Sequence, residues 1–289
     1  MSDLERAVAQ VRFPSDQHRC LVLGLARVYG EDPVVRAILL GGSLSRERGH
    51  PSSDVDLVVV VPAEHLGDFL VRERDREPAY RALGATLIET EPDGATLDFG
   101  GMAAHVWSTD GVLRPQVGGM LRDDSFELAI AAFVYGRPLL ERDDYLQTSR
   151  ARYLPFYAED LRRDRLCRLR DEFAFNLRQV EFMAERGLYF HGLERLIVAF
   201  RLFVMFLFLT RRRYPIDYLK HVEEQVGEWL GRPDLLPVMR DVLALPQLDG
   251  PTLRAKAGLL RTLVEQERRD DCVARTRARP DGLRCLRAH

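Results

Sequence analysis

The spacing of hydrophobic residues along the chain changes near residue 120. Before that point, short unbroken apolar runs alternate with segments whose apolar positions recur at helical spacing. This mixture is typical of strands and helices that share one domain. After that point, only the helical spacing continues. The pattern therefore predicts an α+β protein, in which a mixed sheet flanked by helices is followed by an all-helical bundle.

The first half contains all the candidate strands. Five short segments rich in β-branched and aliphatic residues are bounded by glycine, proline or turn residues, as expected of strands. Helices are predicted beside them over residues 1–30 and 63–82. The predicted strands are Val34–Leu40, Val55–Val61, Thr86–Glu89, Thr96–Phe99 and Met102–Ser108.

The second half is predicted to be helical throughout. Glycine and proline residues in the segment Gly111–Gly119 mark the boundary, so we expect one domain over residues 1–119 and a helical domain over residues 120–289. The arginine-rich tail after about residue 276 is expected to be poorly ordered. Helices are predicted over residues 125–136, 155–186, 192–212, 216–230, 233–244 and 251–275.

The composition indicates an ordinary globular protein, with 46% hydrophobic and 30% charged residues. The 42 lysine and arginine residues almost balance the 44 aspartate and glutamate residues. This balance excludes a protein that coats nucleic acid through a general cationic excess. The most apolar stretch, Leu196–Leu209, is interrupted by Arg201 and is shorter than the roughly 20 residues that a membrane span requires. We therefore expect a buried helix there and no contact with a membrane.

Two features predict a cytoplasmic location. The polar segment Met1–Gln10 lacks the apolar core of a signal peptide. The four cysteines are scattered and include no CxxC pair, which fits neither a zinc site nor a disulfide framework. Such isolated thiols are typical of a reducing compartment. The cysteines are Cys20, Cys167, Cys272 and Cys285.

Candidate chemistry is concentrated in the first two predicted strands. The first strand ends at Gly41, Gly42 and Ser43, and the second strand opens with Asp54 and Asp56. Glycine lets the backbone approach a ligand closely, and free N–H groups at a helix start can bind the phosphates of a nucleotide. Residues two apart in a strand point to the same face. Both carboxylates are therefore aimed together, beside the glycine turn.

Two carboxylates beside a phosphate-binding turn require cations between them. Mg²⁺ is the natural ion, because proteins commonly hold it through one or two carboxylates together with the phosphates of a substrate. Two such ions would activate an attacking oxygen and stabilise a pyrophosphate leaving group. The segment therefore predicts a site for an NTP and two Mg²⁺ ions.

This segment resembles the signature of the DNA polymerase β-like nucleotidyltransferase superfamily, in which Gly-Ser is followed by a loop of about ten residues and then by Asp-x-Asp. A small catalytic domain followed by a helical bundle also resembles the bacterial aminoglycoside and lincosamide nucleotidyltransferases. The resemblance implies transfer of a nucleoside monophosphate, expected to be AMP, to a hydroxyl acceptor. It also implies that Gly41, Gly42 and Ser43 bind the phosphates, and that Asp54 and Asp56 hold the metals.

The resemblance further implies a third carboxylate on a later strand. Asp98 lies between Leu97 and Phe99 and has the expected local pattern, so it is the candidate for the third metal ligand. Alternatively, the strand Met102–Ser108 takes this place, which would put His105 in the position. A histidine there would suit Mg²⁺ poorly and would indicate an impaired enzyme.

The loop between the glycines and the carboxylates supplies further candidates. Arg46 would reach the phosphates with its forked donors, and Ser53 would orient the loop before Asp54. The resemblance implies that the acceptor is a small hydroxylated molecule such as an antibiotic. The alternatives are a toxin-like enzyme that modifies tRNA or protein, with nucleic acid only as an acceptor, and a nucleotide-binding protein with impaired catalysis.

Overall fold

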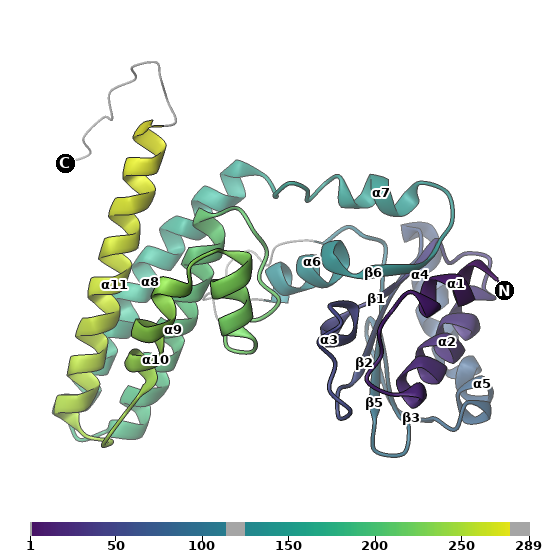
Figure 1. Ribbon diagram of the computed structural model, residues 1–289, viewed down its shortest axis with the longest axis horizontal. Helices are drawn as coiled ribbons and strands as arrows, with labels where there is room; N and C mark the ends of the chain where they lie inside the picture. The colour runs from purple at the N-terminus through teal and green to yellow at the C-terminus, as the bar shows by residue number, and fades with distance from the viewer. Residues whose placement is uncertain (1, 114–124, 278–289) are drawn as a thin grey trace. The chain divides into compact units, whose positions relative to one another are not determined.

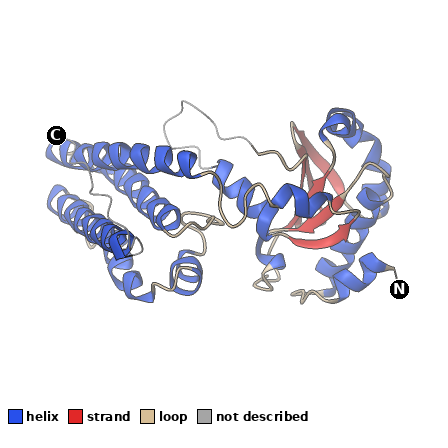
Figure 2. Ribbon diagram, turned by 90° about the horizontal axis from the view of Figure 1, so that it is seen from above, coloured by secondary structure: helices blue, strands red, loops and turns tan. Residues whose placement is uncertain are grey.

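The computed structural model describes residues 2–113 and 125–277 (Figure 1). Within these ranges, residues that contact one another in space group into two compact units. The first is formed by residues 2–113 with 125–157 and the second by residues 158–277. The predicted boundary at residue 119 lies outside the described residues, as does the end of the predicted tail. Figure 2 shows that the strands belong to the first unit.

A six-stranded mixed sheet forms the centre of the first unit, in the order β3-β4-β5-β2-β1-β6. Neighbouring strands are antiparallel, except that β2 and β5 are parallel. All five predicted strands are present. The strands are β1 (Ala37–Leu40), β2 (Val55–Val60), β3 (Thr86–Glu91), β4 (Gly94–Asp98), β5 (Ala103–Thr109) and β6 (Arg137–Glu141). The helices of this unit are α1 (Asp3–Ala9), α2 (Asp16–Gly30), α3 (Gly42–Ser45), α4 (Ala63–Val71), α5 (Glu77–Ala82), α6 (Ser125–Tyr135) and α7 (Tyr145–Arg150), with a 3-10 turn at Arg72–Arg76.

Strand β6 was not predicted, because the pattern after residue 124 indicates helices only. The strand is short and contains Pro138, which lowers its strand propensity but is tolerated at a sheet edge. It pairs antiparallel with β1, where Ala37 lies opposite Glu141. This pairing brings residues 125–157 into the first unit, whereas the pattern of hydrophobic residues groups them with the helical half.

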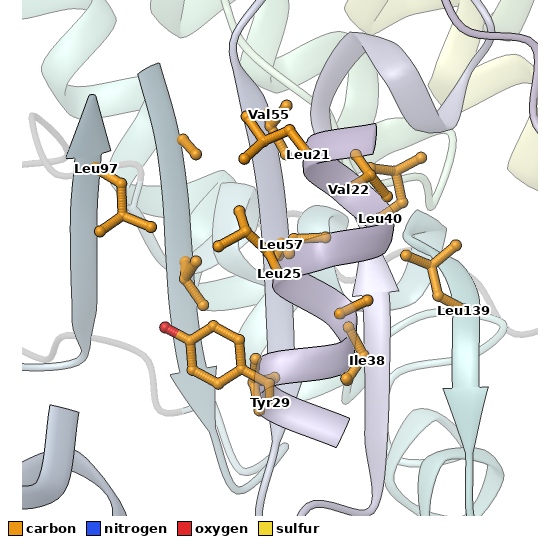
Figure 3. Close-up of a cluster of buried hydrophobic side chains, with 14 of the residues drawn as sticks. Leu21, Val22, Leu25, Tyr29, Ile38, Leu40, Val55, Leu57, Leu97 and Leu139 are labelled. Carbon is orange, nitrogen blue, oxygen red and sulfur yellow. The ribbon is translucent and has the colours of Figure 1, made fainter. Parts of the chain in front are cut away.

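The core of the first unit lies between α2 and one face of the sheet (Figure 3). Leu21 and Leu25 of α2 pack with Ile38, Val55 and Leu57, and each of these side chains is at most 1% exposed. Because successive residues of a strand point to opposite faces, the residues between them in β2 face away from α2. On the face opposite α2, Val58 and Val60 are also buried, and Asp56 is the partly buried residue of β2.

The second unit contains only helices among its described residues. Three long helices, α8 (Glu159–Glu185), α9 (Tyr189–Thr210) and α11 (Gly250–Arg277), pack against one another. The segment predicted as one helix over 216–230 contains a short π-helical segment, Glu224–Trp229. A 3-10 turn, Pro233–Leu235, leads into α10 (Leu236–Leu243). The predicted fold class, a mixed sheet followed by a helical region, is confirmed.

The apolar stretch falls within α9 and is buried, as predicted. A helix of the length and apolarity needed to cross a bilayer is not found in the described part of the chain.

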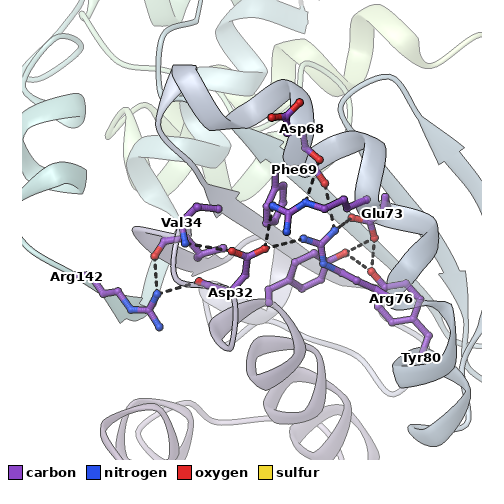
Figure 4. Close-up of polar contacts among 11 residues, drawn as sticks. Asp32, Val34, Asp68, Phe69, Glu73, Arg76, Tyr80 and Arg142 are labelled. Carbon is purple, nitrogen blue, oxygen red and sulfur yellow. Dashed lines mark hydrogen bonds and ion pairs between the residues drawn. The ribbon is translucent and has the colours of Figure 1, made fainter.

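A buried polar cluster joins α2 to the segment between α4 and α5 (Figure 4). Glu73 is 2% exposed, accepts hydrogen bonds from the phenols of Tyr29, at 2.7 Å, and Tyr80, and pairs with Arg76 at 3.0 Å. The Arg76 guanidinium also lies 4.1 Å from the centre of the Phe69 ring. Burial raises the pKa of both phenols, so they remain protonated donors. The cluster thus gives the buried Glu73 carboxylate two hydrogen-bond donors and an opposite charge, which offset the free-energy cost of burying it.

Replacing Glu73 by alanine is expected to lower the free energy of unfolding by about 3 kcal/mol, because Arg76 and two buried phenols then lose a charged acceptor. Urea unfolding followed by circular dichroism measures this loss. The control is Glu77→Ala, which removes an exposed ion pair with Arg81 and is expected to cost less than about 0.5 kcal/mol. Equal losses in the two variants would contradict a stabilising role for the cluster.

Candidate active site

Strand β1 ends in a glycine pair that lies directly against Asp56. The N–H of Gly41 donates to the carbonyl oxygen of Asp56 at 2.8 Å, which continues the pairing of β1 with β2. A Cβ atom added to Gly42 would lie 1.9 Å from Oδ2 of Asp56, and Gly42 has a φ of +58°. Both the space and the backbone conformation therefore favour glycine at this position.

The loop that follows is organised around Ser53. The hydroxyl of Ser43 donates to Oγ of Ser53 at 3.1 Å, and the same Oγ accepts from the N–H of His50 at 2.9 Å. The N–H of Ser53 donates back to the carbonyl oxygen of His50 at 2.8 Å. Two predicted nucleotide-binding residues, Ser43 and Ser53, are thus brought into contact at the start of β2.

His18 of α2 holds this loop from the side of the core. Its Nε2 donates to the carbonyl oxygen of Ser53 at 3.0 Å, and its Nδ1 accepts from the hydroxyl of Ser15 at 2.7 Å. The ring is fully buried. The sequence analysis did not identify His18. The available signal is its spacing of three and seven residues from Leu21 and Leu25, which places a histidine on the buried face of α2.

The two carboxylates follow at the start of β2. Asp54 is exposed and Asp56 is partly buried. Val55 lies between them and belongs to the core on the α2 side, so alternation places both carboxylates on the opposite face. Their oxygens are hard donors of the kind that Mg²⁺ prefers. Gly42 has no Cβ, so its backbone lies close to Oδ2 of Asp56. The phosphate oxygens of a nucleotide bound at the glycine turn would then supply the remaining ligands of an ion held by Asp56.

The position beside Asp56 on the next strand is taken by His105. Parallel strands β2 and β5 pair with Asp56 opposite His105. Asp98 lies on β4, beyond β5, where it pairs with Ala103, and its Oδ1 accepts from the N–H of Gly101 at 3.0 Å. Within residues 2–113 and 125–277, no three His, Cys, Asp or Glu residues form a metal-binding group. Asp98 as a third metal ligand stays a prediction. The register of β2 and β5 places His105, and not Asp98, beside Asp56.

Arg46 lies against the glycine turn, as a nucleotide contact would require. Its guanidinium donates to the carbonyl oxygen of Gly42 at 2.8 Å. The next residue, Glu47, has a φ of +58° and pairs with Arg137 of β6 at 3.0 Å. Arg137 also donates to the carbonyl oxygen of Gln10 at 2.8 Å. Strand β6 therefore helps to fix the loop that contains Arg46.

Comparison with known proteins identifies the part of the chain that contains the glycine turn and the two carboxylates. Residues 26–86 match the family model described as a nucleotidyltransferase domain, and this range contains the glycine turn and both carboxylates. A comparison with curated proteins found no match. Among solved structures, a nucleotidyltransferase-like protein from Exiguobacterium sibiricum 255-15 is similar at 16% sequence identity. The similarity covers 89% of this chain and 79% of that protein, with a TM-score of 0.41. The domain match indicates a transferase of phosphorus-containing groups.

Proposed function

We propose that this chain transfers a nucleoside monophosphate from an NTP to a hydroxyl acceptor and releases pyrophosphate. One observation supports this function above the others. Gly42 packs against the carboxylate of Asp56, so the glycine turn and the two-carboxylate strand form a single site. This site lies inside the segment that matches a nucleotidyltransferase domain.

Each residue of the site has a proposed role. Gly41, Gly42 and Ser43 bind the β- and γ-phosphates through backbone N–H groups and the serine hydroxyl. Asp54 and Asp56 hold Mg²⁺, for which we expect two ions, and bound Mg²⁺ neutralises the charge of the phosphates. In addition, Arg46 contacts the phosphates and Ser53 orients the loop. Catalysis depends mainly on positioning and charge neutralisation.

The proposed donor is ATP, and the proposed acceptor is a small hydroxylated molecule such as an antibiotic. A second candidate function is nucleotide binding with impaired catalysis. The observation that favours it is His105, which stands opposite Asp56 where a carboxylate would complete a metal site.

One assay separates the two functions. The purified protein is incubated with each labelled NTP and Mg²⁺, and with a panel of antibiotics, tRNA and the protein itself as acceptors. Label in one acceptor together with pyrophosphate release supports transfer, and the acceptor identifies the substrate class. Saturable NTP binding with no label transfer and no pyrophosphate across the panel contradicts transfer and favours the binding function.

A further inference from the structure

A pocket of about 260 Å³ opens beside β4 and β5, within the first unit. The proposed nucleotide contacts do not use it. His105 and Trp107 alternate in β5 with the core residues Ala104 and Val106, so they share the sheet face of Asp56. The side chains that give the pocket its chemistry are Glu91, Asp93, Thr96, His105 and Trp107, with Ala129 of α6 also in the lining.

Three of these side chains form a hydrogen-bonded row across β3, β4 and β5. The hydroxyl of Thr96 donates to Oε1 of Glu91 at 3.0 Å. A hydroxyl has a single proton, so at the 3.1 Å contact with His105 the Thr96 oxygen is the acceptor and Nδ1 of His105 is the donor. The ring proton is therefore on Nδ1. In the neutral ring, Nε2 then holds a lone pair.

The row ends next to the carboxylate site. His105 lies opposite Asp56 on neighbouring strands, which are about 4.8 Å apart in a sheet. The His105 side chain is exposed and lines the pocket. Its contact with Thr96 is the one hydrogen bond that its ring makes within the described residues. The lone pair of Nε2 is thus available to a ligand that occupies the pocket.

We propose that this pocket holds the acceptor and that Nε2 of His105 accepts the proton of its hydroxyl group. The inference rests on the proposed transfer function. In this step the O–H bond of the acceptor breaks and the proton passes to Nε2. The acceptor oxygen forms a bond to the α-phosphorus of the NTP. The bond from that phosphorus to the bridging oxygen breaks, and pyrophosphate leaves with the electron pair.

The hydrogen-bonded row fixes the tautomer and the ring orientation of His105, the proposed general base. A histidine works as a base when a second group fixes its tautomer and ring orientation, and Thr96 and Glu91 together provide that group. Thr96 and Glu91 are therefore positioning residues, because they act through His105. The carboxylates of Glu91 and Asp93 favour an acceptor with a cationic group, and Trp107 adds an aromatic side chain to the lining. A polyanion such as RNA would be repelled.

Kinetics of four variants test the roles of the row and of Asp93 in the pocket lining. His105→Asn retains an N–H group for Thr96 but removes the base, and we expect kcat to fall about 100-fold while the Kd for NTP stays unchanged. Thr96→Val is expected to lower kcat about tenfold, and Thr96→Ser is expected to restore it. Asp93→Asn is expected to raise KM for a cationic acceptor with little change in kcat. The control is His65→Asn, an exposed position on α4.

A readout independent of activity tests the tautomer. ¹⁵N NMR of the histidine rings is expected to show His105 protonated at Nδ1 in the full chain, with the signal altered in Thr96→Val. A proton on Nε2, or an unchanged kcat in His105→Asn with the wild-type chain active, would overturn the inference and leave the transfer function intact. Failure of the wild-type chain to transfer label to any acceptor would overturn both, and label found only on tRNA would overturn the assignment of a cationic acceptor to this pocket.

Discussion

The double substitution Asp54→Asn and Asp56→Asn is expected to lower the rate of nucleoside monophosphate transfer by at least about 1,000-fold. Asparagine keeps the shape of each side chain but removes the charge that holds a divalent cation. The two carboxylates share one face of β2, so both charges are lost from the same place. Pyrophosphate release from labelled NTP at saturating Mg²⁺ gives the rate.

A matched double substitution controls for the change in net charge. Asp68→Asn with Asp75→Asn removes two exposed carboxylates of the first unit, and its rate is expected to stay within twofold of the unmodified chain. Circular dichroism and the unfolding midpoint are expected to show that both double variants fold. A folded Asp54→Asn, Asp56→Asn protein that retains its transfer rate would remove these residues from the site.

Gly42→Ala is expected to lower kcat/KM for the NTP by about 100-fold, which corresponds to roughly 2.7 kcal/mol. The added Cβ would lie 1.9 Å from Oδ2 of Asp56, so the carboxylate or the glycine turn has to move. The φ of +58° adds strain for any residue other than glycine. Steady-state kinetics, together with the Kd for NTP by calorimetry, measure the effect.

Gly100→Ala separates steric contact from backbone strain. Gly100 has a φ of +65° but no atom within 4 Å of an added Cβ. This variant is expected to lose about 1 kcal/mol of unfolding free energy through strain, while transfer stays within twofold. If Gly42→Ala and Gly100→Ala affect transfer equally, the contact between the glycine turn and Asp56 has no role in the reaction.

The parts of this protein that could be predicted from sequence are those in which the signal is local. The glycine turn ends one strand and the carboxylates open the next, so the short segment 41–56 contains the pattern that predicts their proximity. The five apolar runs of the first half also identified their strands correctly. The helical spacing identified the long helices of the second unit.

The neighbour of Asp56 could not be predicted, because strand order is a long-range property. Asp98 and His105 are seven residues apart, on adjacent strands of opposite direction, and each has a strand-like local pattern. Only the pairing of β5 with β2 decides which of them stands opposite Asp56. Strand β6 was also not predicted, because it forms by pairing with β1, which lies about a hundred residues earlier in the chain.

The position of Pro138 has a consequence for behaviour at high protein concentration. Strands β6 and β3 are the two edges of the sheet, and an exposed edge can recruit a strand from another chain and begin aggregation. Pro138 removes one backbone N–H from the β6 edge. The exposed side chains of Glu89 and Glu91 place negative charge on β3. Both edges of the sheet are thus protected against aggregation by strand addition.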